Sequence, residues 1–78
     1  MNLKGQELAI LKFVNQNPEG VDEDTICREC RAKASRSRSI LASLVARGLL
    51  FRDWLTVSPS LFVTTPFGRQ VLSAEGGF

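Results

Sequence analysis

The spacing of the apolar residues changes at Gly48, and this change constrains the fold more than any other feature of the chain. Before Gly48, apolar side chains recur every three or four residues, as they do in amphipathic helices. After it, the stretches Leu49–Val57 and Leu61–Thr64 are rich in aliphatic and aromatic residues, which is typical of strands. The sequence therefore predicts helices followed by a β-hairpin. A chain of 78 residues has room for one such domain, spanning residues 1–78.

The first two predicted helices have clear ends. The first spans Leu3 to Gln16 and stops at the turn sequence of residues 17–20, Asn-Pro-Glu-Gly. The second follows Asp22, a favourable N-cap residue, and ends near Cys30. Val21 and Ile26 occupy the positions of a hydrophobic staple around this cap, one just before it and one four residues after it.

The third predicted helix carries both a buried stripe and a polar first turn. It begins at Ser35 as the N-cap and runs to Arg47. Gly48 then ends the helix in a left-handed turn, with Leu49 folding back onto the helix end. The expected buried stripe consists of Ile40, Leu41, Leu44 and Val45.

A hairpin and a short helix complete the chain. The two strands are joined by the turn sequence of residues 58–60, Ser-Pro-Ser. Thr65 caps the last helix and Pro66 takes its first position, where proline is preferred. The residues expected to pack inward from this helix are Phe67, Val71 and Leu72. The sequence thus predicts a mainly α (α+β) fold: three helices, a two-stranded β-hairpin wing and a short C-terminal helix. This is the element order of a winged helix-turn-helix.

The net charge of +2 conceals a polarised distribution. Between residues 28 and 52, Glu29 is the one acidic residue, while the remainder of the chain is net negative. The basic residues of this segment are Arg28, Arg31, Lys33, Arg36, Arg38, Arg47 and Arg52. A basic third in a weakly charged protein favours an anionic partner. The alternative is a solvated surface on which the charges are merely uneven.

The residue types present argue against an enzyme. The chain contains no histidine, which excludes Ser-His and Cys-His nucleophilic catalysis and any histidine-containing metal site. Cys27 and Cys30 are too close in sequence to staple distant segments, and zinc needs about four ligands. We expect buried structural cysteines and no cofactor, with a metal-binding or redox-sensing thiol pair as the alternative. The acidic residues 22–24 are interpreted as a helix start that complements the dipole, with a cation site as the alternative.

The hydropathy pattern favours a cytoplasmic location. No apolar run approaches the roughly 18 residues needed to cross a bilayer. The residues Met1 to Lys4 lack the apolar stretch of a signal peptide. We therefore expect no membrane partner.

Two segments resemble winged-helix transcription factors of the MarR-like and PadR-like group. Residues Leu44–Leu50 resemble the L-x-x-x-G-L/I-L/I junction at which the recognition helix ends. Residues Thr65–Leu72 resemble the LT-x-x-G-R-x-x-L element that follows the wing. Together with the element order, this resemblance covers nearly the whole chain.

The resemblance implies sequence-specific binding of double-stranded DNA and a role in transcription regulation, with the third helix in the major groove. Arginine can bind guanine bidentately, and serine can bind base edges or phosphates. The implied reading residues are Ser35, Arg36, Ser37, Arg38 and Ser39. The implied phosphate contacts are Arg31 and Lys33, with Arg52 as a further one. The serines could instead satisfy backbone groups of an exposed turn, or be phosphorylated.

The chain departs from this group in two respects. The expected wing tip, Val57–Leu61, is short and uncharged, so groove contact by the tip is not implied. The long terminal helices on which MarR-like dimers form are also missing, so a homodimer would need another surface, such as the first and last helices.

The alternative function is a protein-protein interaction module, an adaptor or an inhibitor that does not bind DNA, because a fold does not fix a function. In that case Phe51, Trp54 and Phe62 are candidates for an exposed apolar patch, whereas a DNA-binding domain is expected to keep them mostly buried.

Overall fold

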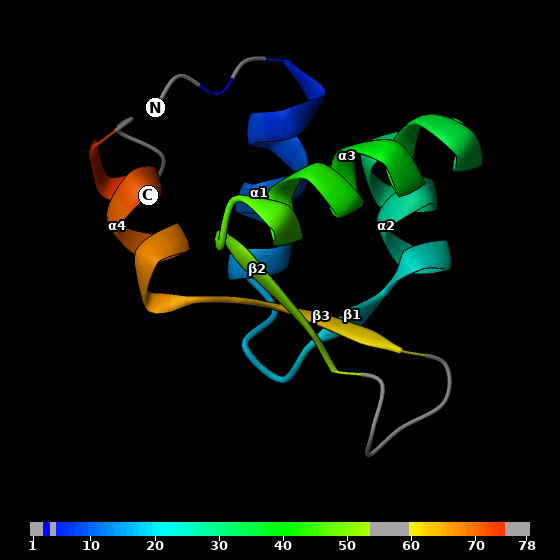
Figure 1. Cartoon of the computed structure of the whole chain (residues 1–78). Coiled ribbons are helices and arrows are strands. Elements are labelled where there is room, and N and C mark those ends of the chain that lie inside the picture. Colours follow the sequence, from blue (N-terminus) through cyan, green and yellow to red (C-terminus); the bar gives the residue numbers. More distant parts are fainter. Residues whose placement is uncertain (1–2, 4, 54–59, 75–78) are drawn as a thin grey trace.

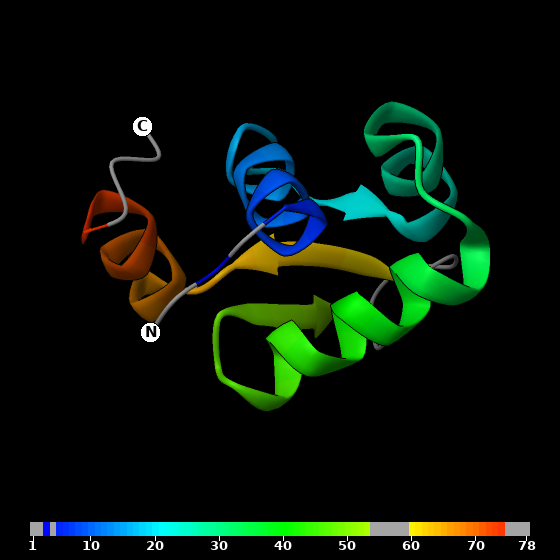
Figure 2. The same cartoon turned by 90° about the horizontal axis from the view of Figure 1, so that it is seen from above.

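The computed structural model describes residue 3, residues 5–53 and residues 60–74 of the chain. This part contains four helices and one three-stranded sheet (Figure 1). The elements are α1 (Gln6–Asn15), β1 (Val21–Asp22), α2 (Glu23–Cys30), α3 (Ala34–Ala46), β2 (Leu50–Asp53), β3 (Leu61–Thr64) and α4 (Pro66–Ala74). Seen from above, α3 runs alongside β2, and α4 lies at the opposite end of the molecule from α2 (Figure 2).

The sheet has one more strand than the sequence predicted. Its order is β1-β3-β2 with antiparallel pairing throughout, so the predicted hairpin is extended by β1 on the free side of β3. Val21 pairs with Phe62, and Arg52 pairs with Phe62 from the other side. The predicted two-stranded hairpin is confirmed as β2 and β3. The additional strand β1 was not predicted, because it has two residues, too few for an alternating pattern, and those residues also carry the cap and staple signals of α2.

The end of α3 confirms the predicted glycine turn. Gly48 has a φ of 79°, a conformation that suits a residue without Cβ. The Leu49 amide donates to the Leu44 carbonyl at 2.9 Å, and the Gly48 amide donates to the Val45 carbonyl at 3.0 Å. These two bonds form a Schellman motif, and its usual apolar contact is supplied by Leu44 and Leu49, both fully buried.

The start of α3 differs from the prediction. The helix begins at Ala34, with Lys33 in the N-cap position and no side-chain cap, so Ser35 lies inside the first turn rather than at the cap. The first helix is also shorter than the predicted Leu3–Gln16, because α1 spans Gln6–Asn15. Asp22 does occupy the predicted N-cap position of α2, although its carboxylate accepts the Thr25 hydroxyl rather than a backbone amide.

The core lies between the four helices and one face of the sheet. Its most deeply buried side chains come from every helix and from the segment after α3: Ile10, Leu11, Val14, Ile26, Leu41, Leu44, Leu49 and Leu72. Val71 is buried as predicted, but the expected inward packing of Phe67 was wrong, because this side chain is 46% exposed. Residues 57–59 of the predicted wing tip lie outside the described residues, as does Trp54, and Leu61 at the end of that predicted tip begins β3.

The turn after α3 and the start of α4 form one close junction. The Thr65 hydroxyl donates to the Gly48 carbonyl at 2.6 Å and accepts the Gly68 amide at 3.0 Å, which confirms Thr65 as the cap of α4. The Thr65 amide donates to the Leu49 carbonyl at 3.1 Å. Gly68 is buried here, and a Cβ at this position would overlap the Leu49 carbonyl oxygen. The junction thus requires a glycine for close approach.

Replacing Gly68 with alanine is expected to destabilise the fold by about 2–3 kcal/mol, because the added methyl group must push α4 away from the Leu49 carbonyl. Urea denaturation followed by circular dichroism measures this loss. Ser73→Ala, on the exposed side of the same helix, is the control and is expected to change the unfolding free energy by less than about 0.5 kcal/mol. Equal stability of the two variants would show that the close approach does not hold α4 in place.

Candidate nucleic-acid interface

The turn between α2 and α3 holds an arginine in a backbone conformation that favours glycine. Arg31 follows the end of α2 with φ 53° and ψ 43°, and it is the one non-glycine residue with positive φ in the described part of the chain. The Ala32 amide donates to the Cys27 carbonyl at 3.1 Å, which closes the helix end around it. The left-handed conformation costs a residue with a Cβ about 1 kcal/mol. The left-handed conformation of Arg31 therefore lowers the stability of the fold, and it places a positive charge on an exposed turn.

The helix α3 has one face in the core and one in solvent. Ser37, Ile40, Leu41 and Leu44 are buried, and the exposed residues lie on the other side of the helix. We call the exposed residues of the helix from Ser35 onward the α3 surface: Ser35, Arg36, Arg38, Ser39, Ala42 and Ala46. Four of the five residues predicted to read DNA therefore share this surface.

Ser37 does not belong to the α3 surface. Its side chain is fully buried, and its hydroxyl has no hydrogen-bond partner within the described residues. Its assignment as a reading residue was wrong, because a group enclosed by the core cannot reach a ligand. Ala42 is the converse case. It was not predicted as a site residue, yet it is exposed one turn after Arg38 and Ser39. Helical spacing alone was the signal that could have found it.

Neighbouring helices contact two arginines of α3 and the arginine at its C-cap. The Arg36 Nε–H donates to Gln6 Oε1 at 2.6 Å, and Arg47 Nη2 lies 3.6 Å from Glu7 Oε2. Both partners belong to the first turn of α1. The third contact joins Arg38 to Glu23 at the start of α2, with 3.2 Å between Nε and Oε1. Such exposed pairs contribute about 0.2–1 kcal/mol, so an anion can displace them at small cost.

The two cations of the turn are less restrained. Arg31 and Lys33 are exposed, and neither has an ion pair within the part of the chain that the structure describes. Both lie in the turn between α2 and α3, Arg31 at the C-cap of α2 and Lys33 at the N-cap of α3. Their charges are therefore available to an external anion.

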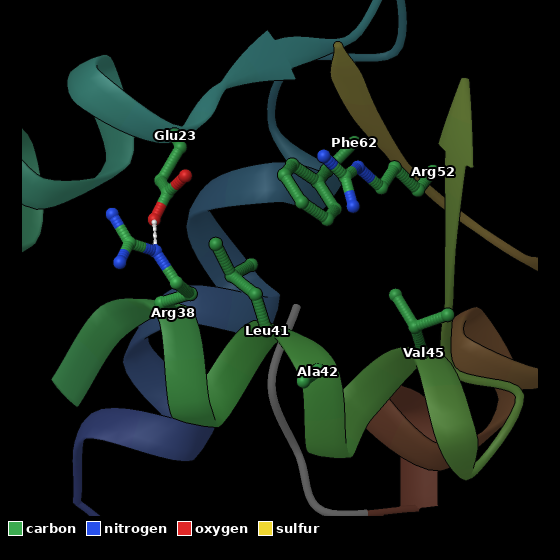
Figure 3. Close-up of a pocket in the computed structure, with 7 residues that line it drawn as sticks. All are labelled: Glu23, Arg38, Leu41, Ala42, Val45, Arg52 and Phe62. Carbon is green, nitrogen blue, oxygen red and sulfur yellow. Dashed lines mark hydrogen bonds and ion pairs between the residues drawn. The ribbon is translucent and has the colours of Figure 1, made fainter. Parts of the chain in front are cut away.

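Arg52 reaches the same region from the sheet. Its guanidinium carbon lies 6.0 Å from the centre of the Phe62 ring, which is the range of a cation–π contact. Between this pair and α3 lies a hollow of about 310 Å³ (Figure 3). Its lining includes the apolar side chains Leu41, Val45 and Phe62. Arg38 and Arg52 lie at opposite sides of the hollow. The hollow separates the two guanidinium groups.

The two thiols lie on α2, away from the α3 surface. Cys27 and Cys30 are both half-buried and free. Burial raises the pKa of the Cys30 thiol, and the neighbouring Glu29 and Cys27 raise it further, so the less nucleophilic protonated form is favoured. Within the described residues, no group of three or more His, Cys, Asp or Glu side chains is placed to hold a metal ion. Among the same residues, no helix is long and apolar enough to cross a membrane.

Comparison with known proteins finds likeness in structure only. No protein-family model matches the sequence, and no curated protein matches it. Solved structures do match, among them the multiple antibiotic-resistance repressor MarR of Listeria monocytogenes. It is 16% identical over 96% of this chain and 50% of that chain, with a TM-score of 0.84.

Two further matches have similar values. Streptococcus pneumoniae FabT, solved in complex with DNA, is 14% identical over 96% of this chain and 53% of that chain, with a TM-score of 0.81. The transcriptional regulator SlyA is 21% identical over 94% of this chain and 51% of that chain, with a TM-score of 0.78.

The chain spans about half the length of the solved structures that it matches. Those whose descriptions state an activity are regulators or repressors, and none of the three named here is described as an enzyme. The match extends over nearly all of this chain and includes the α2–α3 pair, the sheet and α4. The chain therefore has the winged helix-turn-helix fold of MarR-type transcriptional regulators.

Proposed function

We propose that this chain binds duplex DNA as a regulator of transcription, with α3 in the major groove. One observation carries the proposal: the exposed cations Arg31, Lys33, Arg36 and Arg38 cluster at the turn and first turns of one helix. None of them is needed for the apolar core. The fold likeness to regulators, one of them solved with DNA, supports the same conclusion.

The proposed contacts divide by chemistry. Arg36 and Arg38 have the length and the bidentate geometry to reach guanine edges, and Ser35 and Ser39 can bond to base edges or phosphates. Ala42 offers a methyl group to the methyl group of thymine. Arg31, Lys33 and Arg52 contact phosphates and fix the register of α3 on the duplex.

Binding energy is expected to come mostly from phosphates. A hydrogen bond to a charged group contributes about 1.5–3 kcal/mol, more than the exposed pairs that now hold Arg36 and Arg38. DNA therefore outcompetes Gln6 for Arg36, while Arg38 can bind DNA through its terminal nitrogens with its Nε–H still bonded to Glu23. Each neutralised phosphate adds about 0.9 to the magnitude of the slope of log affinity against log salt, so the three phosphate-binding cations give a slope of about −3.

Replacing both Arg36 and Arg38 with alanine is expected to abolish DNA binding at physiological salt while leaving the fold intact, because both side chains are exposed. Fluorescence anisotropy of a labelled duplex at several salt concentrations measures the affinity, and circular dichroism checks the fold. The control is Lys12→Ala with Arg69→Ala, which removes the same charge from α1 and α4. Retained binding in the first variant would show that α3 is not the contact element.

Arg31→Gly separates stability from binding. Glycine adopts the left-handed conformation freely, so the unfolding free energy is expected to rise by about 0.5–1 kcal/mol. The same change removes one phosphate contact, so DNA binding weakens and the salt slope becomes shallower by about 0.9. Denaturation and salt-dependent anisotropy measure the two effects. Unchanged DNA affinity in a stabilised variant would remove Arg31 from the interface.

A second candidate, the protein-interaction module, is favoured by one observation. Phe51 is 55% exposed on β2, although Phe62, also expected in an exposed patch, is buried. The exposed apolar surface would suit a protein partner or a second copy of this chain. If the wild-type chain binds no duplex even at low salt, this candidate replaces the first, and Phe51→Ser is then the variant expected to lose partner binding.

A further inference from the structure

Glu23 is an acidic residue in direct contact with a proposed DNA-reading arginine. It is the first residue of α2, and its Oε1 accepts the Nε–H of Arg38 on α3 at 3.2 Å (Figure 3). The Arg38 side chain is 73% exposed and the Glu23 side chain 33%. The contact therefore spans the two helices of the helix-turn-helix at its open surface.

The contact leaves the terminal nitrogens of Arg38 free. Only Nε bonds to Glu23, and neither Nη1 nor Nη2 has a hydrogen-bond partner within residues 3, 5–53 and 60–74. Figure 3 shows both terminal nitrogens turned away from the hollow between α3 and the sheet. These two nitrogens form one of the edges with which a guanidinium binds two acceptors at once.

We propose that Glu23 is a positioning residue for DNA recognition, holding Arg38 by its Nε so that the Nη1–Nη2 edge is presented to guanine. This inference rests on the proposed function. A long side chain that is ordered before binding loses less conformational entropy when it meets its base. The Glu23 carboxylate also keeps the Nε–H satisfied once Arg38 is enclosed in the groove, where a donor without a partner is costly.

Charge alone gives Glu23 a second and opposite effect. A carboxylate beside the duplex repels phosphates, so its removal tightens binding to every sequence. Asp24 carries the same charge one residue further along α2 and forms no ion pair within the described residues. The positioning effect belongs to Glu23 alone, and it affects only a site that offers Arg38 the correct base. Discrimination between duplexes therefore separates the two effects.

The experiment measures the affinity of the 78-residue chain for two duplexes. One is enriched from a random-sequence pool by the wild-type protein, and the other is a scrambled duplex of the same composition. Glu23→Ala is expected to lower the ratio of the two affinities by about two- to tenfold. Glu23→Gln is expected to lower it less, because its amide oxygen can still accept the Nε–H. Asp24→Ala is expected to tighten both duplexes alike and leave the ratio unchanged.

The same substitutions in a chain with Arg38→Ala complete the test. In that background, Glu23→Ala is expected to leave the ratio unchanged, which a general loss of structure would not do. Should Glu23→Ala and Asp24→Ala tighten both duplexes equally in the original chain, Glu23 acts through charge alone and the positioning role is overturned, while the proposed function stands. A wild-type chain that binds no duplex overturns the proposed function itself. Glu23→Gln keeps the positioning role testable if the alanine variant does not fold.

Discussion

The close approach of α4 to the turn after α3 is the contact on which the rest of the structure depends. Gly48 ends α3 in a tight turn. The Leu49 carbonyl then accepts a hydrogen bond from the Thr65 amide and packs against Gly68. The Thr65 hydroxyl joins Gly48 to the first turn of α4. The end of α3, the start of β2 and the end of β3 therefore meet at one point. This fixes the direction in which α3 leaves the sheet, and with it the surface that α3 presents.

The presented surface is held in place by weak contacts with neighbouring helices. The first turn of α1 contacts arginines near both ends of α3, and the first residue of α2 contacts Arg38. Each contact is exposed and contributes little to stability. Their effect is instead to order long side chains that would otherwise sample many rotamers, while their charges stay exposed to an anion. The strained backbone at Arg31 fits the same pattern, since stability is lost where a charge is displayed.

The parts of the fold with strong local signals could be predicted from the sequence. The turn at Gly48 and the cap at Thr65 depend on residues a few positions apart, and both were confirmed in detail. The strand β1 could not be predicted in this way, because its existence depends on pairing with a distant segment. The start of α3 was misplaced because Ser35 has the residue type of a cap, while the N-cap position falls two residues earlier, at Lys33.

The sequence predicted most of the residues exposed on the first turns of α3, but not the contacts that hold their side chains. Ser37 lies three residues before Ile40 and four before Leu41, so helical spacing places it on the buried face, which the polar residue type obscured. Phe67 was misplaced for the converse reason: its apolar type suggested burial, but the buried residues of α4 are its neighbour Gly68 together with Val71 and Leu72. The contacts of Arg36 and Arg38 join different helices, and no local pattern in the sequence could predict them.

The measurement that tests the central claim most directly is a titration of the isotope-labelled chain with a short duplex, followed through its backbone amide NMR signals. The account predicts that the largest shifts fall on residues 31–42, in the turn and the first turns of α3, and that they shrink as salt is added. Shifts centred instead on β2 and α4, around Phe51 and Phe67, or no shifts at low salt, would contradict it.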